Sequence, residues 1–306
     1  MYKFYFEHIK DRLPDRVHGL LYRLAVARTR ARRERLRKLI LSYYKNHGEN
    51  HGPQDEALEF LRTNPLCLIP YPWTRKYFEM PVKVYRENGL RYVLTADENK
   101  LYFKRDMDDY AVKKMFRELS MEQDPRSPHL YAKRAGDTVV DLGAAEGFFA
   151  LSVAKEAGHL YLFESDPQWI EPLEATFRDF ADKVTIVNKF VSDSDDGRSV
   201  SLDTYFRDTY FRDRRISLLK ADLEGAEPGM LRGAAGLLSG GRIDMASVCT
   251  YHHPGHASEF TRIFESYGYS VRAVPGLMPH WEPPHLLTGM IWAEKDKQED
   301  KQEDKL

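Results

Sequence analysis

Short apolar runs alternate with amphipathic stretches along the second half of the chain. The apolar runs predict strands near 138–142, 160–164, 184–188, 216–221, 244–250, 269–274 and 286–293. The stretches between them predict helices near 147–157, 167–180, 226–238 and 256–267. Such alternation favours a parallel sheet covered on both faces. Because no helix separates the last two strands, we expect them to pair antiparallel within a seven-stranded sheet.

The chain before residue 131 is organised differently. Leu and Tyr positions on both sides of the basic run 28–38 predict an amphipathic helix, and 82–94 reads as a hairpin that turns at Asn88-Gly89. We expect four parts in chain order: a basic amphipathic helical segment over 1–45, a small α+β accessory module over 54–130, the main α/β domain over 131–294 and a disordered charged tail over 295–306.

The first strand of the main domain ends in a glycine turn, Val-Val-Asp-Leu-Gly-Ala-Ala-Glu-Gly at 139–147. Gly143 and Gly147 leave bare backbone, so that the turn can form and a nucleotide-like ligand can approach. The spacing Asp-x-Gly-x-x-x-Gly differs from the Gly-x-Gly-x-x-Gly of dinucleotide enzymes. Asp141 suits the cationic S-adenosylmethionine better than a pyrophosphate. An ordinary strand–turn–helix unit is the alternative interpretation.

Acidic residues follow two further strands. Glu164 ends the second strand, where a carboxylate can hold a ribose diol, and Asp166 can begin the next helix. Asp222, Glu224 and Glu227 follow the fourth strand at the edge where ligands bind in open α/β sheets. Mutual repulsion is expected to raise the pKa of at least one of these three acids. Glu227, which precedes a proline, can instead serve only to start a helix.

Histidines gather after the fifth strand. His252, His253 and His256 are expected on the same side of the sheet as Asp222. Imidazoles and carboxylates together can bind zinc or manganese, but the bend at Pro254-Gly255 disfavours helical ligand spacing, so we expect no metal. We expect His252 or His253 to act as a general base near pH 7, and Glu224 or Glu227 is the alternative base.

Three segments together resemble the FkbM-type family of S-adenosylmethionine-dependent methyltransferases. They are the glycine turn, Ser201-Leu202-Asp203, and Leu-Lys-Ala-Asp-Leu-Glu-Gly-Ala-Glu at 219–227, and the resemblance spans about 136–293. It implies a Rossmann-like class I fold, S-adenosylmethionine as cofactor, and O-methylation of a hydroxyl on a sugar, polysaccharide or related natural product. Members tend to carry an acid before a histidine after the fifth strand, where this chain has Tyr251-His252.

The resemblance also implies roles for individual residues. Asp141, Gly143 and Gly147 would line the cofactor, Glu164 would hold its ribose, and Asp222 would face the reacting methyl group. The expected cofactor-binding residues are Asp141, Gly143, Ala145, Gly147, Glu164, Asp193 and Asp222, and the expected catalytic residues are Asp222, Glu224, His252 and His253.

Charge is distributed unevenly along the chain. The net charge of the 306 residues is −1, yet residues 1–45 hold 13 Lys or Arg against four acids. A basic amphipathic helix can lie on anionic lipid, so peripheral membrane contact through residues 16–45 is one expectation. Packing of the helix on the domain or on a second subunit is the other.

Composition bounds the remaining possibilities. No apolar run is long enough to span a membrane, and two cysteines, Cys67 and Cys249, do not make a disulfide framework. We therefore expect a cytoplasmic enzyme with a small-molecule or saccharide acceptor and no specific nucleic acid. A non-catalytic methyltransferase fold that docks to a membrane or a partner is the alternative function, and an NAD-dependent reductase is disfavoured by the first turn.

Overall fold

The computed structural model describes residues 15–47, 53–132, 136, 138–207, 215–280 and 285–296, with side chains from Arg28 onward. The predicted tail beyond Asp296 and the first part of the predicted helical segment lie outside the described residues. Two compact units are formed, Met1–Trp73 with Leu277–Leu287 and Thr74–Gly276 with Thr288–Leu306. The predicted accessory module is divided between these units at Trp73.

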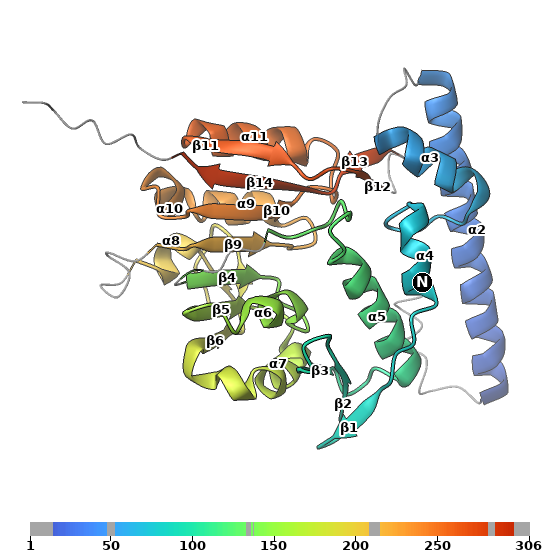
Figure 1. Ribbon diagram of the computed structural model, residues 1–306, viewed down its shortest axis with the longest axis horizontal. Coiled ribbons are helices and arrows are strands. Elements are labelled where there is room, and N and C mark those ends of the chain that lie inside the picture. The colour runs from blue at the N-terminus through green and yellow to red at the C-terminus, as the bar shows by residue number, and fades with distance from the viewer. Residues whose placement is uncertain are drawn as a thin grey trace, which may run out of the picture. The chain divides into compact units, whose positions relative to one another are not determined.

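The second unit contains a seven-stranded sheet in the order β11-β14-β10-β9-β4-β5-β6 (Figure 1). Its strands are β4 (Thr138–Leu142), β5 (His159–Phe163), β6 (Val184–Val187), β9 (Leu218–Ala221), β10 (Met245–Cys249), β11 (Tyr269–Ala273) and β14 (Met290–Lys295). β14 is antiparallel to both of its neighbours, whereas β4, β5, β6, β9 and β10 pair in parallel. The predicted sheet and its antiparallel last strand are confirmed.

The predicted strand 286–293 is wrong as a single element. The chain forms β13 (Leu286–Thr288) and then β14, with Gly289 between them. β13 pairs with β12 (Leu277–Pro279) rather than with the large sheet. The break is not visible in the sequence, because the strands on both sides of it bury hydrophobic side chains and read as one apolar run.

Helices cover both faces of the sheet because both sets of alternating side chains along its strands are apolar. Val139 belongs to one buried cluster with residues of α6 and α7, and Val140 belongs to the other with residues of α9, α10 and α11. The first face carries α6 (Phe148–Val153), η3 (Pro167–Trp169), α7 (Ile170–Thr176) and η4 (Arg178–Lys183). The opposite face carries α8 (Leu202–Tyr205), α9 (Glu227–Arg232), α10 (Ala235–Ser239) and α11 (His256–Ser266). Short strands β7 (Phe190–Val191) and β8 (Ser199–Val200) pair in parallel.

A three-stranded antiparallel sheet precedes β4 in the second unit. It consists of β1 (Tyr85–Glu87), β2 (Leu90–Leu94) and β3 (Lys100–Phe103), followed by α5 (Asp109–Glu122), and α4 (Arg75–Phe78) comes before it. The predicted hairpin is confirmed, since Asn88 and Gly89 have the positive φ values, 51° and 80°, that a two-residue turn requires. Leu101, Phe103 and Val112 join the cluster that contains α6 and α7, so this module covers the first face of the large sheet.

The first unit contains α2 (Asp15–His47), α3 (Pro53–Thr63) and η2 (Pro72–Thr74). The guanidinium of Arg37 in α2 donates to the carbonyl oxygen of Leu61 in α3 at 2.6 Å. On α2, Leu36 and Ile40 are buried, whereas Leu39 and Tyr43 are exposed. No helix in the described residues is both long and apolar enough to cross a membrane.

Candidate active site

A buried ion pair lies beneath the glycine turn. Asp141 on β4 is the register partner of Lys220 on β9, and the Lys220 ammonium is 2.9 Å from its carboxylate. The same ammonium donates to the carbonyl oxygen of Gly143 at 2.8 Å. Burial raises the pKa of Asp141, and the charge of Lys220 opposes this rise. Asp141 therefore supports the turn from below, and it is not among the residues that line the adjacent cavity.

Close packing inside the protein requires glycine at both positions of the turn. Gly143 has a φ of 73°, and a Cβ there would lie 2.0 Å from the carbonyl oxygen of Asp222. Gly147 has a φ of 83°, and its Cβ would lie 2.6 Å from Phe177 and 2.9 Å from Leu173. Gly147 therefore permits helix packing, and Gly143 permits the approach of the β9 loop. Gly143 also lines the adjacent cavity, where it is expected to leave room for the ligand.

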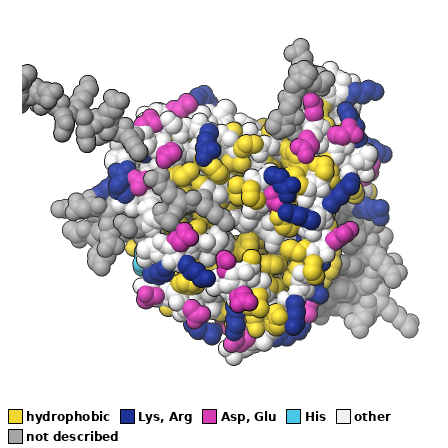
Figure 2. Space-filling model, in the orientation of Figure 1, with side chains coloured by type: hydrophobic (Ala, Val, Ile, Leu, Met, Phe, Trp, Pro, Cys, Tyr) yellow, Lys and Arg dark blue, Asp and Glu magenta, His cyan; other side chains and the backbone are white. Residues whose placement is uncertain are grey.

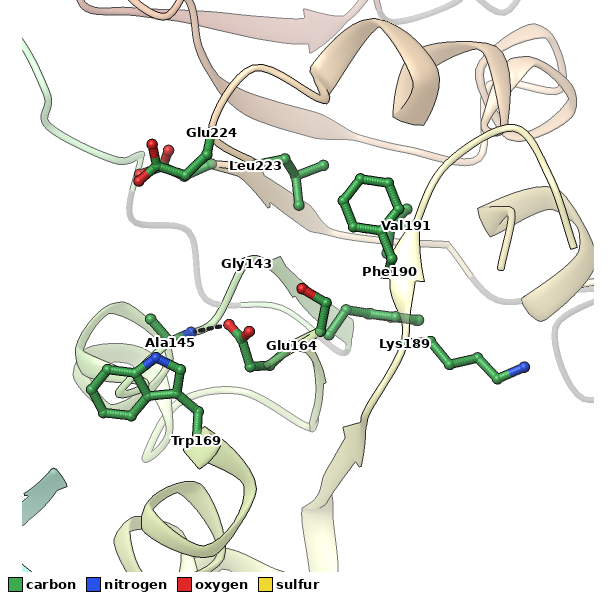
Figure 3. Close-up of a pocket in the computed structure, with 12 residues that line it drawn as sticks. Gly143, Ala145, Glu164, Trp169, Lys189, Phe190, Val191, Leu223 and Glu224 are labelled. Carbon is green, nitrogen blue, oxygen red and sulfur yellow. Dashed lines mark hydrogen bonds between the residues drawn. The ribbon is translucent and has the colours of Figure 1, made fainter. Parts of the chain in front are cut away.

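A cavity of about 350 Å³ opens beside the turn (Figure 3). Gly143, Ala145, Glu164, Trp169 and Asp222 are among its lining residues. Further lining residues are Phe163, Ser165, Lys189, Phe190, Val191, Leu223 and Glu224. The cavity thus extends from the ends of β4 and β5 to the end of β9, as expected for a ligand crevice in an open α/β sheet.

Two backbone amides hold the Glu164 carboxylate at this cavity. The amide of Ala145 donates to one carboxylate oxygen at 2.9 Å, a contact drawn in Figure 3. The amide of Asp166 donates to the other oxygen at 2.7 Å. Each oxygen retains further acceptor capacity, so a ligand diol can still bind. Asp166 itself caps the short helix η3 by accepting from Gln168, which confirms its predicted structural role.

Asp222 lies at the centre of the polar groups at the end of β9. Its Oδ2 accepts from the Tyr131 hydroxyl at 2.9 Å and is 3.5 Å from Nε2 of His129. Its Oδ1 is 3.6 Å from Nε2 of His252. Burial alone raises the pKa of Asp222, but His129, Lys220 and His252 outweigh it and hold that pKa well below its usual range. Asp222 is therefore not the acid whose pKa repulsion raises, although a rise is expected for at least one acid of this group.

A second carboxylate orients His252. Nδ1 of His252 is 3.0 Å from Oε1 of Glu227, which is fully buried. The same oxygen accepts from the backbone amide of Leu223 at 2.8 Å. Burial lowers the pKa of His252, yet the nearby carboxylates of Glu227 and Asp222 outweigh it and raise that pKa. The pKa of Glu227 is lowered, because His252 outweighs the effect of burial.

The structure brings only some of the predicted site residues together. The Glu224 side chain is 92% exposed, with one oxygen 3.9 Å from Nε2 of His252. His253 is exposed, and its ring lies 5.2 Å from that of the buried His256. Asp193 forms an ion pair with Arg232 at 2.6 Å and does not line the cavity.

Several residues of the site were not predicted. His129 and Tyr131 come from the loop before β4, and Trp169 comes from the helix after β5. The loop before β4 has no periodic pattern of apolar residues in the sequence. Only the fold shows that this loop covers the ends of β9 and β10. One available signal was Lys220, a cation within a buried apolar strand, because a buried charge requires a partner.

The fold and the site define a class of protein. Residues 96–271 match the model of the methyltransferase FkbM domain. Because this match covers more than half of the chain, the protein belongs to the FkbM methyltransferase family, and its sheet is that of a Rossmann-like class I methyltransferase.

Solved structures with a similar fold include two named methyltransferases. The methyltransferase FkbM from Methylobacillus flagellatus is 17% identical with a TM-score of 0.41, over 61% of this chain and 55% of that chain. This chain therefore spans about half the length of that protein. Precorrin-6y C5,15-methyltransferase from Geobacter metallireducens is 12% identical with a TM-score of 0.37, over 58% of this chain and 88% of that chain. No curated protein gives a match.

Proposed function

We propose that this protein is an S-adenosylmethionine-dependent O-methyltransferase that acts on a hydroxyl of a sugar, a polysaccharide or a related natural product. The observation that carries the proposal is the array of Glu227, His252 and Asp222. Glu227 holds Nδ1 of His252 at 3.0 Å, and Nε2 faces Asp222, which lines the cavity. An imidazole oriented by a carboxylate is suited to removing a proton from a hydroxyl.

The cavity residues fit S-adenosylmethionine. Its volume, about 350 Å³, lies within the range of small-molecule sites. Glu164, Asp222 and Glu224 make its lining acidic, and the ammonium of Lys189 points away from the other lining groups (Figure 3). Such a lining favours a cationic sulfonium and opposes a pyrophosphate. Trp169 adds a flat apolar surface beside Glu164, suited to a nucleoside.

The chain supplies positioning and one proton acceptor to the reaction. S-adenosylmethionine, when bound, provides the electrophilic methyl group. We assign Nε2 of His252 as the atom that takes the proton from the acceptor hydroxyl, because Glu227 occupies Nδ1. Asp222, fixed by Tyr131 at 2.9 Å, orients the acceptor hydroxyl. A positioned base contributes about 10²–10⁴-fold to rate, and in-line alignment contributes the remainder of the acceleration.

Isothermal titration with S-adenosylmethionine is the first test. Binding by the full chain is expected, whereas its absence would favour the non-catalytic binding module. Methyl transfer to a panel of saccharides and hydroxylated natural products would then identify the acceptor class. His252→Ala is expected to lose turnover and to keep cofactor affinity, since His252 does not line the cavity. Full turnover in that variant would contradict the assigned base.

We also propose that α2 contacts an anionic membrane surface. Exposed basic side chains lie on α2, namely Arg28, Arg30, Arg32, Arg33, Arg35 and Lys38. Figure 2 shows several Lys and Arg side chains on the described part of α2 and α3. Sedimentation with anionic vesicles is expected to weaken as salt rises. Equal binding to neutral vesicles would contradict the proposal.

A further inference from the structure

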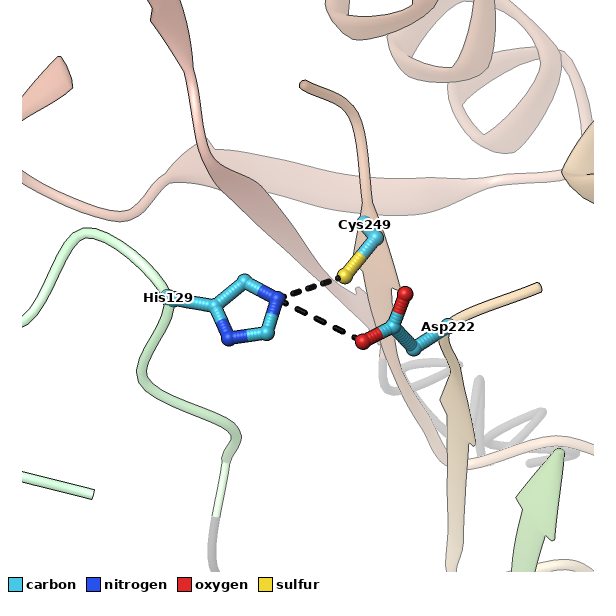
Figure 4. A group of neighbouring side chains, drawn as sticks. All are labelled: His129, Asp222 and Cys249. Carbon is cyan, nitrogen blue, oxygen red and sulfur yellow. Dashed lines mark hydrogen bonds and ion pairs between the residues drawn. The ribbon is translucent and has the colours of Figure 1, made fainter. Parts of the chain in front are cut away.

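A cluster of three possible metal ligands lies at the ends of β9 and β10 (Figure 4). Nε2 of His129 is 3.1 Å from Sγ of Cys249 and 3.5 Å from Oδ2 of Asp222. Each residue offers one ligand atom, and these atoms all lie within 4.8 Å of one another. The three side chains come from the loop before β4, the end of β10 and the end of β9, so only the tertiary fold brings them together.

We propose that His129, Asp222 and Cys249 form a zinc site. Tetrahedral zinc, with Zn–S of about 2.3 Å and Zn–N or Zn–O of about 2.0–2.1 Å, places its nitrogen about 3.6 Å from a sulfur ligand and about 3.3 Å from an oxygen ligand. The distances of 3.1 and 3.5 Å in this cluster differ from those values by only a few tenths of an ångström. Small side-chain movements would therefore admit the cation.

The groups around the cluster are those that support a metal-bound histidine. Oε2 of Glu122 is 3.6 Å from Nδ1 of His129, on the side of the ring opposite Cys249. The two groups are too far apart to be hydrogen-bonded, but a small movement of the ring would let Glu122 accept the Nδ1 proton, and a carboxylate bound in this way orients a ligand histidine and increases its basicity. Nδ1 is buried and has no hydrogen-bond partner among the described residues. The Tyr131 hydroxyl similarly fixes the carboxylate of Asp222.

The ligand set favours zinc over magnesium or calcium. Sulfur, imidazole and carboxylate together suit a borderline-soft cation, whereas the alkaline-earth cations prefer oxygen alone. Burial raises the pKa of the Cys249 thiol. A bound divalent cation would displace the thiol proton and leave the thiolate as ligand.

Three protein ligands leave a fourth zinc position for a substrate. Asp222 is the member of the cluster that also lines the cavity, so that position is expected on the cavity side. A hydroxyl bound there would become more acidic and give its proton to His252. The oxygen would then form a bond to the methyl carbon, and the carbon–sulfur bond would break with its electrons returning to sulfur. This catalytic role rests on the proposed function, whereas the metal site itself does not.

The test uses the purified full chain, stripped of metal and titrated separately with Zn²⁺ and Co²⁺. We expect one ion per chain and, with Co²⁺, a thiolate-to-cobalt charge-transfer absorption. Cys249→Ser should abolish this absorption, whereas Cys67→Ser, the matched cysteine control, should keep it. Glu122→Gln should weaken Zn²⁺ binding by about 10–100-fold and keep the absorption, since Glu122 acts through His129.

Two results would overturn the zinc site. One is a wild-type protein that binds no stoichiometric Zn²⁺, and the other is a thiolate–cobalt absorption that survives Cys249→Ser or is lost in Cys67→Ser. If Cys249→Ser does not fold, the Glu122→Gln affinity decides, and unchanged affinity there would also refute the site. S-adenosylmethionine titration of the metal-free protein separates the two proposals, because cofactor binding without zinc binding would leave the proposed function standing.

Discussion

Replacing Glu227 with glutamine tests whether the protein activates its substrate through an oriented histidine. Glutamine keeps an oxygen that can accept from Leu223, as the carboxylate does at 2.8 Å. It removes the charge that lies 3.0 Å from Nδ1 of His252. Hydrogen bonds to charged groups contribute about 1.5–3 kcal/mol. Because about 1.4 kcal/mol corresponds to tenfold, we expect kcat to fall by about 10–100-fold.

The pH dependence gives this prediction a second, independent readout. A base must be neutral to accept a proton, and Glu227 raises the pKa of His252. Activity is therefore expected to be lost as pH falls through that raised pKa. Without the negative charge the pKa of His252 drops, so the acid limb of the pH–rate profile should move to lower pH. The plateau should fall at the same time, because a neutral amide oxygen holds the proton on Nδ1 less strongly than the carboxylate does.

Glu224→Gln is the matched comparison for this assay. The Glu224 side chain is 92% exposed and 3.9 Å from His252, so solvent screens its charge. We expect a small change in kcat and a nearly unmoved acid limb. Methyl transfer would be followed at saturating cofactor across the pH range, and cofactor affinity would be measured by calorimetry for both variants. An unmoved acid limb in Glu227→Gln, or a larger loss in Glu224→Gln, would refute the reasoning.

Three further predictions follow from the site. Glu164→Ala should weaken S-adenosylmethionine binding by about 1.5–3 kcal/mol through lost charge-assisted hydrogen bonds, and calorimetry showing unchanged affinity would contradict the assigned ribose contact. Gly143→Ala should lower the melting temperature even without cofactor, because its Cβ would lie 2.0 Å from the carbonyl oxygen of Asp222. Lys220→Met should destabilise the fold by about 3–5 kcal/mol in denaturant unfolding, because it leaves Asp141 buried without its partner. The double variant with Asp141→Asn should recover part of that loss.

Local sequence determined the elements and much of their order. The apolar runs around Val139 and Leu160 fixed strands because a buried parallel strand is apolar on both faces. Asn88-Gly89 fixed a hairpin because few other dipeptides adopt two positive φ values. These signals lie within a few residues of the structure that they produce, so they can be read without the rest of the chain.

The composition of the candidate site depended on tertiary structure. The pairing of Asp141 with Lys220 follows from strand order, because β9 lies beside β4 although β5 follows β4 in the chain. His129 meets Asp222 and Cys249 only because the loop before β4 lies across the ends of two other strands. The sequence identified Asp222 and His252 as reactive groups. Only their three-dimensional neighbours decided that Asp222 stays charged and that Glu227 orients the histidine, since pKa and orientation depend on groups a few ångströms away in space.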